Sequence, residues 1–319
     1  MTITSTATIT DVTVRPLTER DLPDADTIFR NAFDTFVGAD DLFGDTDHIC
    51  TRWQADPSAA IGAEHDGQLI GSNFIADWGS VGFFGPLTVR PDFWDRHIAS
   101  QLMDATMQLF ADRALTSTGL FTFPHSAKHL GLYQKFGYSP QHLTPVMAKP
   151  VDASSKLQPA WLAVSAAGAD RDGLIAACRA LTDQLHEGLD LTREIVAVET
   201  QRLGDTIVVT DDQGVSAMAV CHVGPGTEAG SGACYVKFGA VRPGSDASDR
   251  FEQLLDGCEV FAASRQAHVL VLGVNTACAE AYESVTRRGF RSQLIGVIMQ
   301  RPNTPGHHRP GVYVIDDWR

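Results

Sequence analysis

The segment VRPDFWDRHIASQLM, residues 89–103, combines a strand that ends at a proline with a short basic loop and a helix that begins at once. The first amides of a helix have no partner within it and lie at the positive end of its dipole, so such a junction can bind an anion. Arg96 adds a positive charge there, and His97 stands where a glycine would be expected. The imidazole of His97 crowds the anion, donates a hydrogen bond to it, or turns outward as a surface residue of a degraded loop.

Composition limits the classes of partner. The chain has 319 residues and a formal net charge of −14, which argues against a general nucleic-acid or anionic-membrane surface. An anionic ligand would therefore need a local group of donors. No apolar run approaches the roughly 20 residues of a membrane span, and the N-terminal MTITSTATIT lacks the basic flank and apolar core of a secretory signal.

The cysteines indicate the redox environment. None of the six belongs to a C-x-x-C pair, and no histidine lies at a spacing suited to a zinc site with them. We therefore expect structural thiols in a reducing cytoplasm, and no metal site.

The chain aligns with itself at an offset of 152 residues. Val89, Arg90 and Pro91 then match Val241, Arg242 and Pro243, and the register continues without a gap to Pro150 and Pro302. This self-similarity predicts an internal duplication, with units at residues 1–150 and 151–319. The segment PVDASSKLQPAW, residues 150–161, has the composition of a linker.

Hydrophobic periodicity predicts the elements of each unit. In the first unit, helices are expected at residues 18–36, 97–115 and 126–137, a hairpin around the turn HDGQ, and strands at residues 80–91, 118–123 and 140–150. The order is βαβββαβαβ, with room for a further helix around residues 45–55. The second unit repeats this order, with a strand at WLAVSAAG, a helical region through residues 170–203, and a final VYVIDDWR that could add an edge strand.

This order, with LTVRPDFWDRHIASQLM at its centre and HLGLYQKFGY some 30 residues later, resembles the GNAT acyltransferase superfamily. The resemblance covers most of the first unit and, more weakly, the second. It implies an α/β (α+β) fold of two tandem GNAT-like units, each a mixed, mostly antiparallel sheet flanked by helices. It also implies a loop whose amides bind the pyrophosphate of acetyl-CoA as co-substrate.

The family's loop pattern is Arg or Gln, two residues, Gly, one residue, then Gly or Ala. Arg96 and Ala99 fit this pattern, whereas Trp94 and His97 depart from it. The resemblance places the cofactor-binding residues at Leu87, Thr88, Val89, Arg96, His97, Ile98, Ala99, Ser100 and Ser126.

The same resemblance suggests catalytic residues. Tyr133 falls where family members carry a tyrosine that protonates the departing thiolate, and Ser126 falls at the position of a frequent asparagine seven residues earlier. A phenol suits this role because its unperturbed pKa near 10 keeps it protonated. His125 and Asp77 are the candidates for a general base that accepts a proton from the attacking amine. A packed aromatic at Tyr133, and solvated loop residues at the other two positions, are the alternatives.

The second unit departs further from the pattern. Its loop VRPGSDASDRF has no glycine at the critical positions, Asp246 and Asp249 add charge of the wrong sign, and Val285 lies opposite Tyr133. We therefore expect a degenerate cofactor loop there, and an N-acetyltransferase acting on a small amine by direct attack in the first unit. A non-catalytic GNAT-fold ligand-binding or interaction protein, and an acyl-CoA thioester decarboxylase or hydrolase, remain alternatives. The acidic balance favours a cationic substrate; the oligomeric state stays open.

Overall fold

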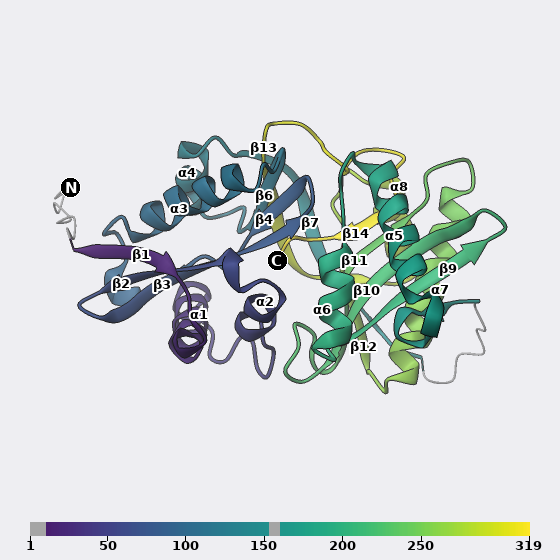
Figure 1. The fold of residues 1–319 in the computed structure, drawn as a ribbon, viewed down its shortest axis with the longest axis horizontal. Helices are drawn as coiled ribbons and strands as arrows, with labels where there is room; N and C mark the ends of the chain where they lie inside the picture. Colours follow the sequence, from purple (N-terminus) through teal and green to yellow (C-terminus); the bar gives the residue numbers. More distant parts are fainter. Residues whose placement is uncertain (1–10, 153–159) are drawn as a thin grey trace.

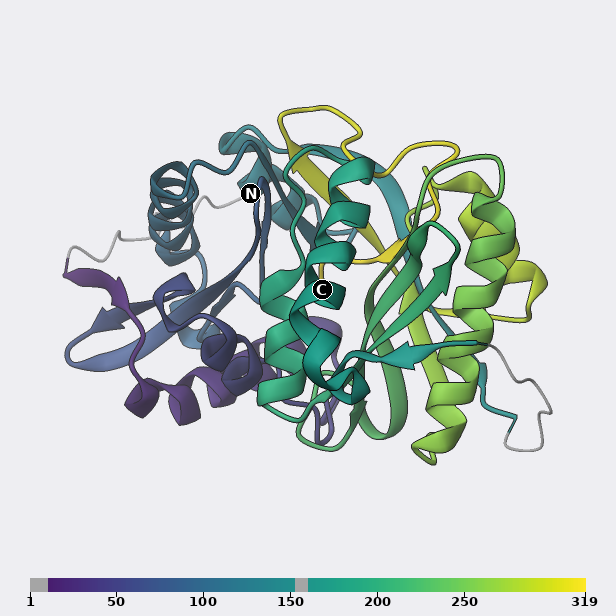
Figure 2. The ribbon, with the colours of Figure 1, turned by 45° about the vertical axis from the view of Figure 1, so that its right-hand side comes forward.

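The computed structural model of the chain describes residues 11–152 and 160–319. Most of the expected linker, residues 153–159, lies outside the described residues. Two mixed α/β units lie side by side, with the C-terminus between them (Figures 1 and 2). None of the described helices has both the length and the apolar character that a membrane span requires.

The helices and strands of the first unit are β1 Val12–Pro16, α1 Leu22–Val37, α2 Ile49–Ala55, β2 Ala60–His65, β3 Gln68–Trp78, β4 Val81–Phe84, β5 Thr88–Val89, α3 Ile98–Asp112, β6 Ser117–Thr122, α4 Ala127–Lys135 and β7 Ser139–Pro150. Those of the second unit are β8 Leu162–Ala163, α5 Arg171–Leu185, α6 Thr192–Thr200, β9 Gly204–Asp211, β10 Gly214–Gly224, β11 Gly230–Val241, α7 Ala247–Ser264, β12 Val269–Gly273, α8 Ala279–Arg287, β13 Arg291–Arg301 and β14 Val314–Asp316.

The helices predicted in the first unit are confirmed as α1, α3 and α4, and α2 occupies the room left at residues 45–55. Helix α1 illustrates why: its apolar residues recur every three or four positions, so Leu22, Ile28 and Phe29 are buried together on one face. The helix ends at Gly38, which adopts a left-handed φ of 73° and donates its amide to the Asp34 carbonyl.

The single strand predicted at residues 80–91 is wrong, because it is divided into β4 and β5. Gly85 has a φ of 149°, and Pro86 has no amide hydrogen to donate to a ladder. In the second unit the strand at WLAVSAAG is reduced to β8, and the helical region through residues 170–203 is two helices. Gly188, at a φ of 77°, turns the chain between them.

The two units share one sheet with exchanged last strands. The strand order is β1-β2-β3-β4-β6-β13-β7-β12-β11-β10-β9-β8. β13 of the second unit inserts between β6 and β7, pairing Met299 with Leu120, while β7 of the first unit pairs with β12, placing Met147 opposite Leu272. Each unit therefore completes its sheet with a strand of the other.

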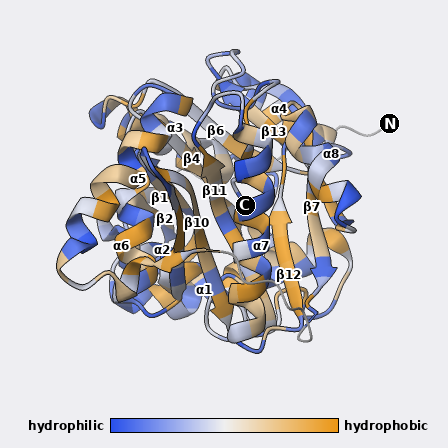
Figure 3. Cartoon of the chain, turned by 90° about the vertical axis from the view of Figure 1, so that its right-hand side faces the viewer, coloured by the Kyte–Doolittle hydropathy of each residue, from blue (hydrophilic) through white to orange (hydrophobic). Residues whose placement is uncertain are grey.

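Helices cover both faces of this sheet. In the first unit α3 and α4 lie on one face and α1 and α2 on the other (Figure 1). Between the helices of the second unit, β12 is almost wholly hydrophobic (Figure 3), and its Leu270 and Leu272 are fully buried. Helix α8 spans residues 279–287 and α4 spans residues 127–135, so the two correspond residue for residue at the 152-residue offset.

The exchange predicts that a β13 substitution destabilises the first unit. Met299 of β13 is fully buried in a cluster with Phe84, Tyr133 and Tyr138 of the first unit. Met299→Ala should lower the free energy of unfolding by about 2–5 kcal/mol, as measured by urea denaturation, because it leaves a cavity in that core. The control is Ile295→Ala on the same strand, where the side chain is 46% exposed; its effect should stay within about 0.5 kcal/mol. Equal losses in both variants would contradict the shared core.

Candidate functional site

The break between β4 and β5 leaves one strand edge unpaired. β4 pairs with β6 in parallel from Val81–Ser117 to Phe84–Leu120, and this pairing stops there. Within the described residues, β5 pairs only with β3, on its other side. Backbone amides and carbonyls need partners, so the edge around Thr88 that is not paired with β3 is open to hydrogen bonds from a ligand.

The loop after β5 presents the first turn of α3. The Gln101 amide donates to the His97 carbonyl, which is the first hydrogen bond of this helix. The amides before Gln101 therefore have no acceptor within the helix. Asp95 and His97 have φ values of 63° and 66°, in the left-handed region where glycine has no steric cost. The loop thus keeps a glycine-type conformation without glycine. The Trp94 indole donates to the Val89 carbonyl at 2.7 Å and ties the loop to β5.

Positive charge gathers at this helix start. The guanidinium of Arg96 lies 5.1 Å from the Phe93 ring centre, and within the described residues it forms no ion pair. Lys128 of α4 pairs with Asp95 at 2.7 Å and lies above the Trp94 ring. Arg96 is therefore free to pair with an anion at the amides of α3.

Tyr133 lies beside the end of β4. Its ring packs edge-to-face on Phe84 with centres 5.7 Å apart, and the residue is 7% exposed. No described residue forms a hydrogen bond with its hydroxyl group. Burial raises the pKa of Tyr133 above the ordinary value, so the phenol remains a proton donor. Ser126 caps α4 by accepting the His129 amide at 3.4 Å.

His125 stands between β6 and α4 and is exposed. Its ring stacks on Phe36 of α1 at 6.1 Å, and His129 lies 4.7 Å from the same ring. Burial lowers the pKa of His129, which keeps that imidazole neutral. His129 was not among the sequence candidates, although its spacing of four residues from His125 was a signal available in the sequence.

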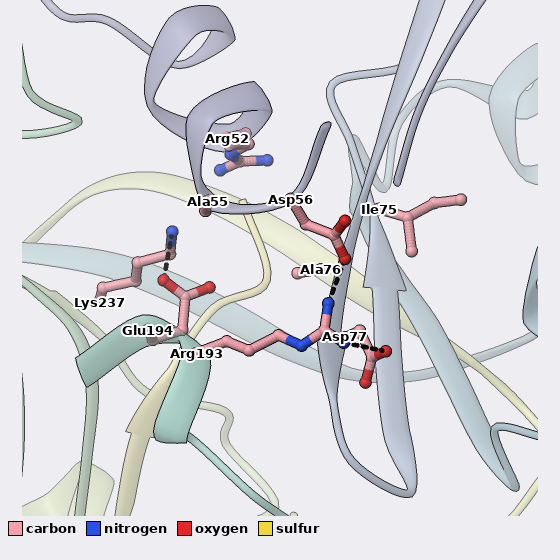
Figure 4. A pocket seen from close by; sticks show the side chains of 9 residues that line it. All are labelled: Arg52, Ala55, Asp56, Ile75, Ala76, Asp77, Arg193, Glu194 and Lys237. Atoms are coloured by element: carbon pink, nitrogen blue, oxygen red, sulfur yellow. Dashed lines mark hydrogen bonds and ion pairs between the residues drawn. The ribbon is translucent and has the colours of Figure 1, made fainter. Parts of the chain in front are cut away.

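Asp77 lies in a different environment from Tyr133. It pairs with Gly82 at the beginning of β4, whereas Tyr133 contacts Phe84 at its end. The Asp77 carboxylate lies 3.1 Å from Arg113, just after α3, and 3.7 Å from Arg193 of the second unit. Figure 4 shows Arg193 reaching between Asp56 and Asp77. Asp77 therefore takes part in a contact between the units.

A group of buried charges joins the two units behind the break. Arg52 of α2 donates to the Gly85 carbonyl at 2.5 Å and pairs with Glu228 of the second unit at 3.0 Å. Lys237 of β11 bridges Glu228 and Glu194 at 3.0 and 3.1 Å. Sequence reasoning missed this group, because Arg52 and Glu228 are far apart along the chain.

Beside these charges lies a cavity of about 30 Å³ lined by Arg52, Asp77, Arg193, Glu194 and Lys237, among others (Figure 4). That volume suits about one water molecule. The cavity is therefore too small for a substrate in this conformation.

The corresponding edge in the second unit is occupied. β11 pairs with β12 from Ala233 to Val236, as β4 pairs with β6. Beyond that point, Phe238 to Ala240 pair with β14 in antiparallel fashion. At the start of α7, Asp246 lies 3.6 Å from Arg250, so the helix start carries its own acid. The two units therefore differ in backbone pairing as well as in loop sequence.

Comparison with known proteins agrees with this architecture. Residues 25–138 match the model of the acetyltransferase (GNAT) family. Curated proteins give no significant sequence match. Among solved structures, a "putative acetyltransferase" from Pyrococcus horikoshii is 13% identical, covering 99% of this chain and 98% of its own, with a TM-score of 0.67.

A GCN5-related N-acetyltransferase from Sphaerobacter thermophilus is 16% identical, covering 94% of this chain and 98% of its own, with a TM-score of 0.60. At these identities the structural likeness establishes the mixed, mostly antiparallel fold, and the family match rests on residues 25–138. The family match therefore concerns the domain at residues 25–138, and the likeness over the rest of the chain is one of fold.

Proposed function

We propose that the chain is an N-acetyltransferase that moves an acetyl group from acetyl-CoA to a small amine by direct attack in the first unit. The observation that carries this proposal is the open strand edge at Leu87–Val89 followed directly by the unpaired amides of α3. An extended ligand with an anionic end fits such an arrangement, because the edge can bind its amides and the helix start its phosphates. The family match supplies the chemistry.

In this proposal the co-substrate lies along Leu87, Thr88 and Val89. The pyrophosphate lies at the amides of residues 97–100, with Arg96 as its cationic partner. Ile98, Ala99 and Ser100 form the first turn of α3, and the Ala99 side chain is small enough for an anion to approach closely. Ser126, which caps the start of α4, is the remaining residue assigned to the co-substrate.

The reaction needs one proton donor and one proton acceptor. The amine nitrogen bonds to the acetyl carbon, the carbon–sulfur bond breaks, and the departing thiolate takes a proton from Tyr133. The amine loses its proton to a base, directly or through water. Of the two candidates, His125 is favoured because it is exposed, whereas the Asp77 carboxylate already lies between Arg113 and Arg193.

The second unit acts as a scaffold for the first in this proposal. Its Glu228 holds Arg52, which holds the Gly85 carbonyl at the break. The acceptor is a cationic amine, in keeping with the net charge of −14. All six cysteines are free thiols, which supports action in a reducing compartment.

One coenzyme A should bind per chain. Isothermal titration of the whole protein with coenzyme A should give a stoichiometry of one, because β14 occupies the edge in the second unit that is open in the first. Two equivalent sites would contradict the scaffold role of residues 151–319. No binding at all would favour the non-catalytic alternative.

Tyr133→Phe should lower turnover by about 10- to 1,000-fold, or roughly 1.4–4 kcal/mol of barrier, with coenzyme A affinity little changed. The measurement is release of free thiol from acetyl-CoA with a panel of small amines. Because burial raises the pKa of Tyr133, the turnover of the wild type should not fall through ionisation of this phenol up to about pH 9.

The matched control is Tyr138→Phe, which removes a buried hydroxyl 3.1 Å from Thr118. That variant should lose about 0.5–1.5 kcal/mol of stability but keep its turnover. Equal turnover in the wild type and both variants would show that a group other than Tyr133 donates the proton. Thiol release that does not depend on the amine would favour the hydrolase or decarboxylase alternative.

His97→Gly should stabilise the protein and weaken its binding of coenzyme A. The left-handed conformation costs about 1–2 kcal/mol for a residue with a Cβ, and the entropy of glycine offsets about 0.5–1 kcal/mol of that gain. His97→Gly should therefore raise the free energy of unfolding in urea by up to about 1.5 kcal/mol. Loss of a donor should reduce coenzyme A affinity by about 2- to 10-fold.

The control for this variant is Ala99→Gly, inside the first turn of α3, which should destabilise by about 0.5–1 kcal/mol. Tighter binding by His97→Gly would show that the imidazole obstructs the phosphates. Unchanged affinity would show that the side chain points away from them.

A further inference from the structure

Three side chains with metal-ligating atoms converge between β13 and β14. His307 and His308 lie in the loop that joins these strands, and Asp316 is the last residue of β14. The three residues are 1–4% exposed. Nε2 of His307 lies 2.7 Å from one carboxylate oxygen of Asp316, and Nε2 of His308 contacts the other. One ligand atom from each residue lies within 4.8 Å of the others.

The charges of this group are unbalanced. The only ion-pair partners of Asp316 among the described residues are the two histidines, and no lysine or arginine reaches it. A buried carboxylate normally requires a cation, either a paired side chain or a metal ion.

We propose that His307, His308 and Asp316 bind a divalent metal ion of the Zn²⁺ type. Two imidazole nitrogens and one carboxylate oxygen form a ligand set that Zn²⁺ accepts, with water as the fourth ligand. With bonds of about 2.0–2.2 Å, ligand atoms around a tetrahedral ion lie about 3.4 Å apart. The His307–Asp316 contact of 2.7 Å therefore needs to open by about 0.7 Å, and ligand atoms as far as 4.8 Å apart need to approach by about 1.4 Å.

The metal ion holds the C-terminal segment in place, and this segment closes in the second unit the strand edge that is open in the first. β14 fills the open edge of β11, and Trp318, just beyond it, stacks on Phe83 of the first unit with ring centres 6.0 Å apart. The ion links β14 to the loop before it, and so holds this segment in place. The site shares no residue with the proposed acetyl-transfer site on β4, β5, α3 and α4, so either proposal can fail without the other.

The test is metal binding by the whole protein. After removal of metals with EDTA, equilibrium dialysis against zinc chloride should leave one Zn²⁺ per chain. Cobalt chloride should give the visible absorption bands of a four-coordinate Co²⁺ site. Asp316→Asn and His308→Gln should each weaken Zn²⁺ binding by more than about 100-fold, since even changes to residues that only hydrogen-bond to a metal ligand reduce affinity by about 10- to 100-fold.

The control is His142→Gln, which removes one exposed histidine elsewhere and should keep wild-type Zn²⁺ affinity. Zn²⁺ should also raise the midpoint of thermal unfolding in the wild type and in this control, but not in Asp316→Asn. Absence of Zn²⁺ and Co²⁺ binding in the wild type overturns the proposal, and this result needs no variant to fold. Equal Zn²⁺ binding by Asp316→Asn and the wild type also overturns it.

Discussion

Strands β7 and β13 each complete the sheet of the other unit, and the remaining features of the molecule depend on this hydrogen-bonded exchange. β13 brings Met299 into the core of the first unit, and β7 brings Met147 into that of the second. Because side chains alternate along a strand, a slip of one residue in β13 would turn Met299 out of its core. Packing therefore fixes the register, and the register fixes how the units face one another.

That arrangement makes the two units unequal. β4 stops at Phe84, and after Gly85 and Pro86 the chain keeps its pairing with β3 but not with β6, so the edge beside β6 stays open. At the corresponding place in the second unit, β11 continues and β14 pairs with it. The same fold thus leaves a strand edge open to a ligand in the first unit, and pairs the corresponding edge with the chain's own backbone in the second. Hydrogen-bonding capacity that a ligand could use in one unit is already satisfied in the other.

Buried charges give the contact between the units its specificity. Arg52, Lys237, Glu194 and Glu228 are all removed from water, which is costly for each of them unless all find partners. Lys237 pairs with Glu194 and Glu228 within the second unit, whereas Arg52 reaches Glu228 only when α2 of the first unit docks against the second. Because Arg52 also holds the Gly85 carbonyl, this docking fixes the backbone at the break. The second unit can therefore influence the proposed site without contributing a residue to the reaction.

Local sequence determined the helices, most strands and the anion-ready start of α3, because periodicity and helix ends depend on neighbours a few residues apart. The resemblance to the GNAT family, not local periodicity, pointed to Tyr133, which lies beside the end of β4. Tertiary structure alone decided the strand exchange, the Arg52–Glu228 pair and the filling of β11 by β14. It also brought His307 and His308 to Asp316, where no metal site was expected from the sequence. These contacts join residues that only the folded backbone brings together, so no local sequence pattern predicts them.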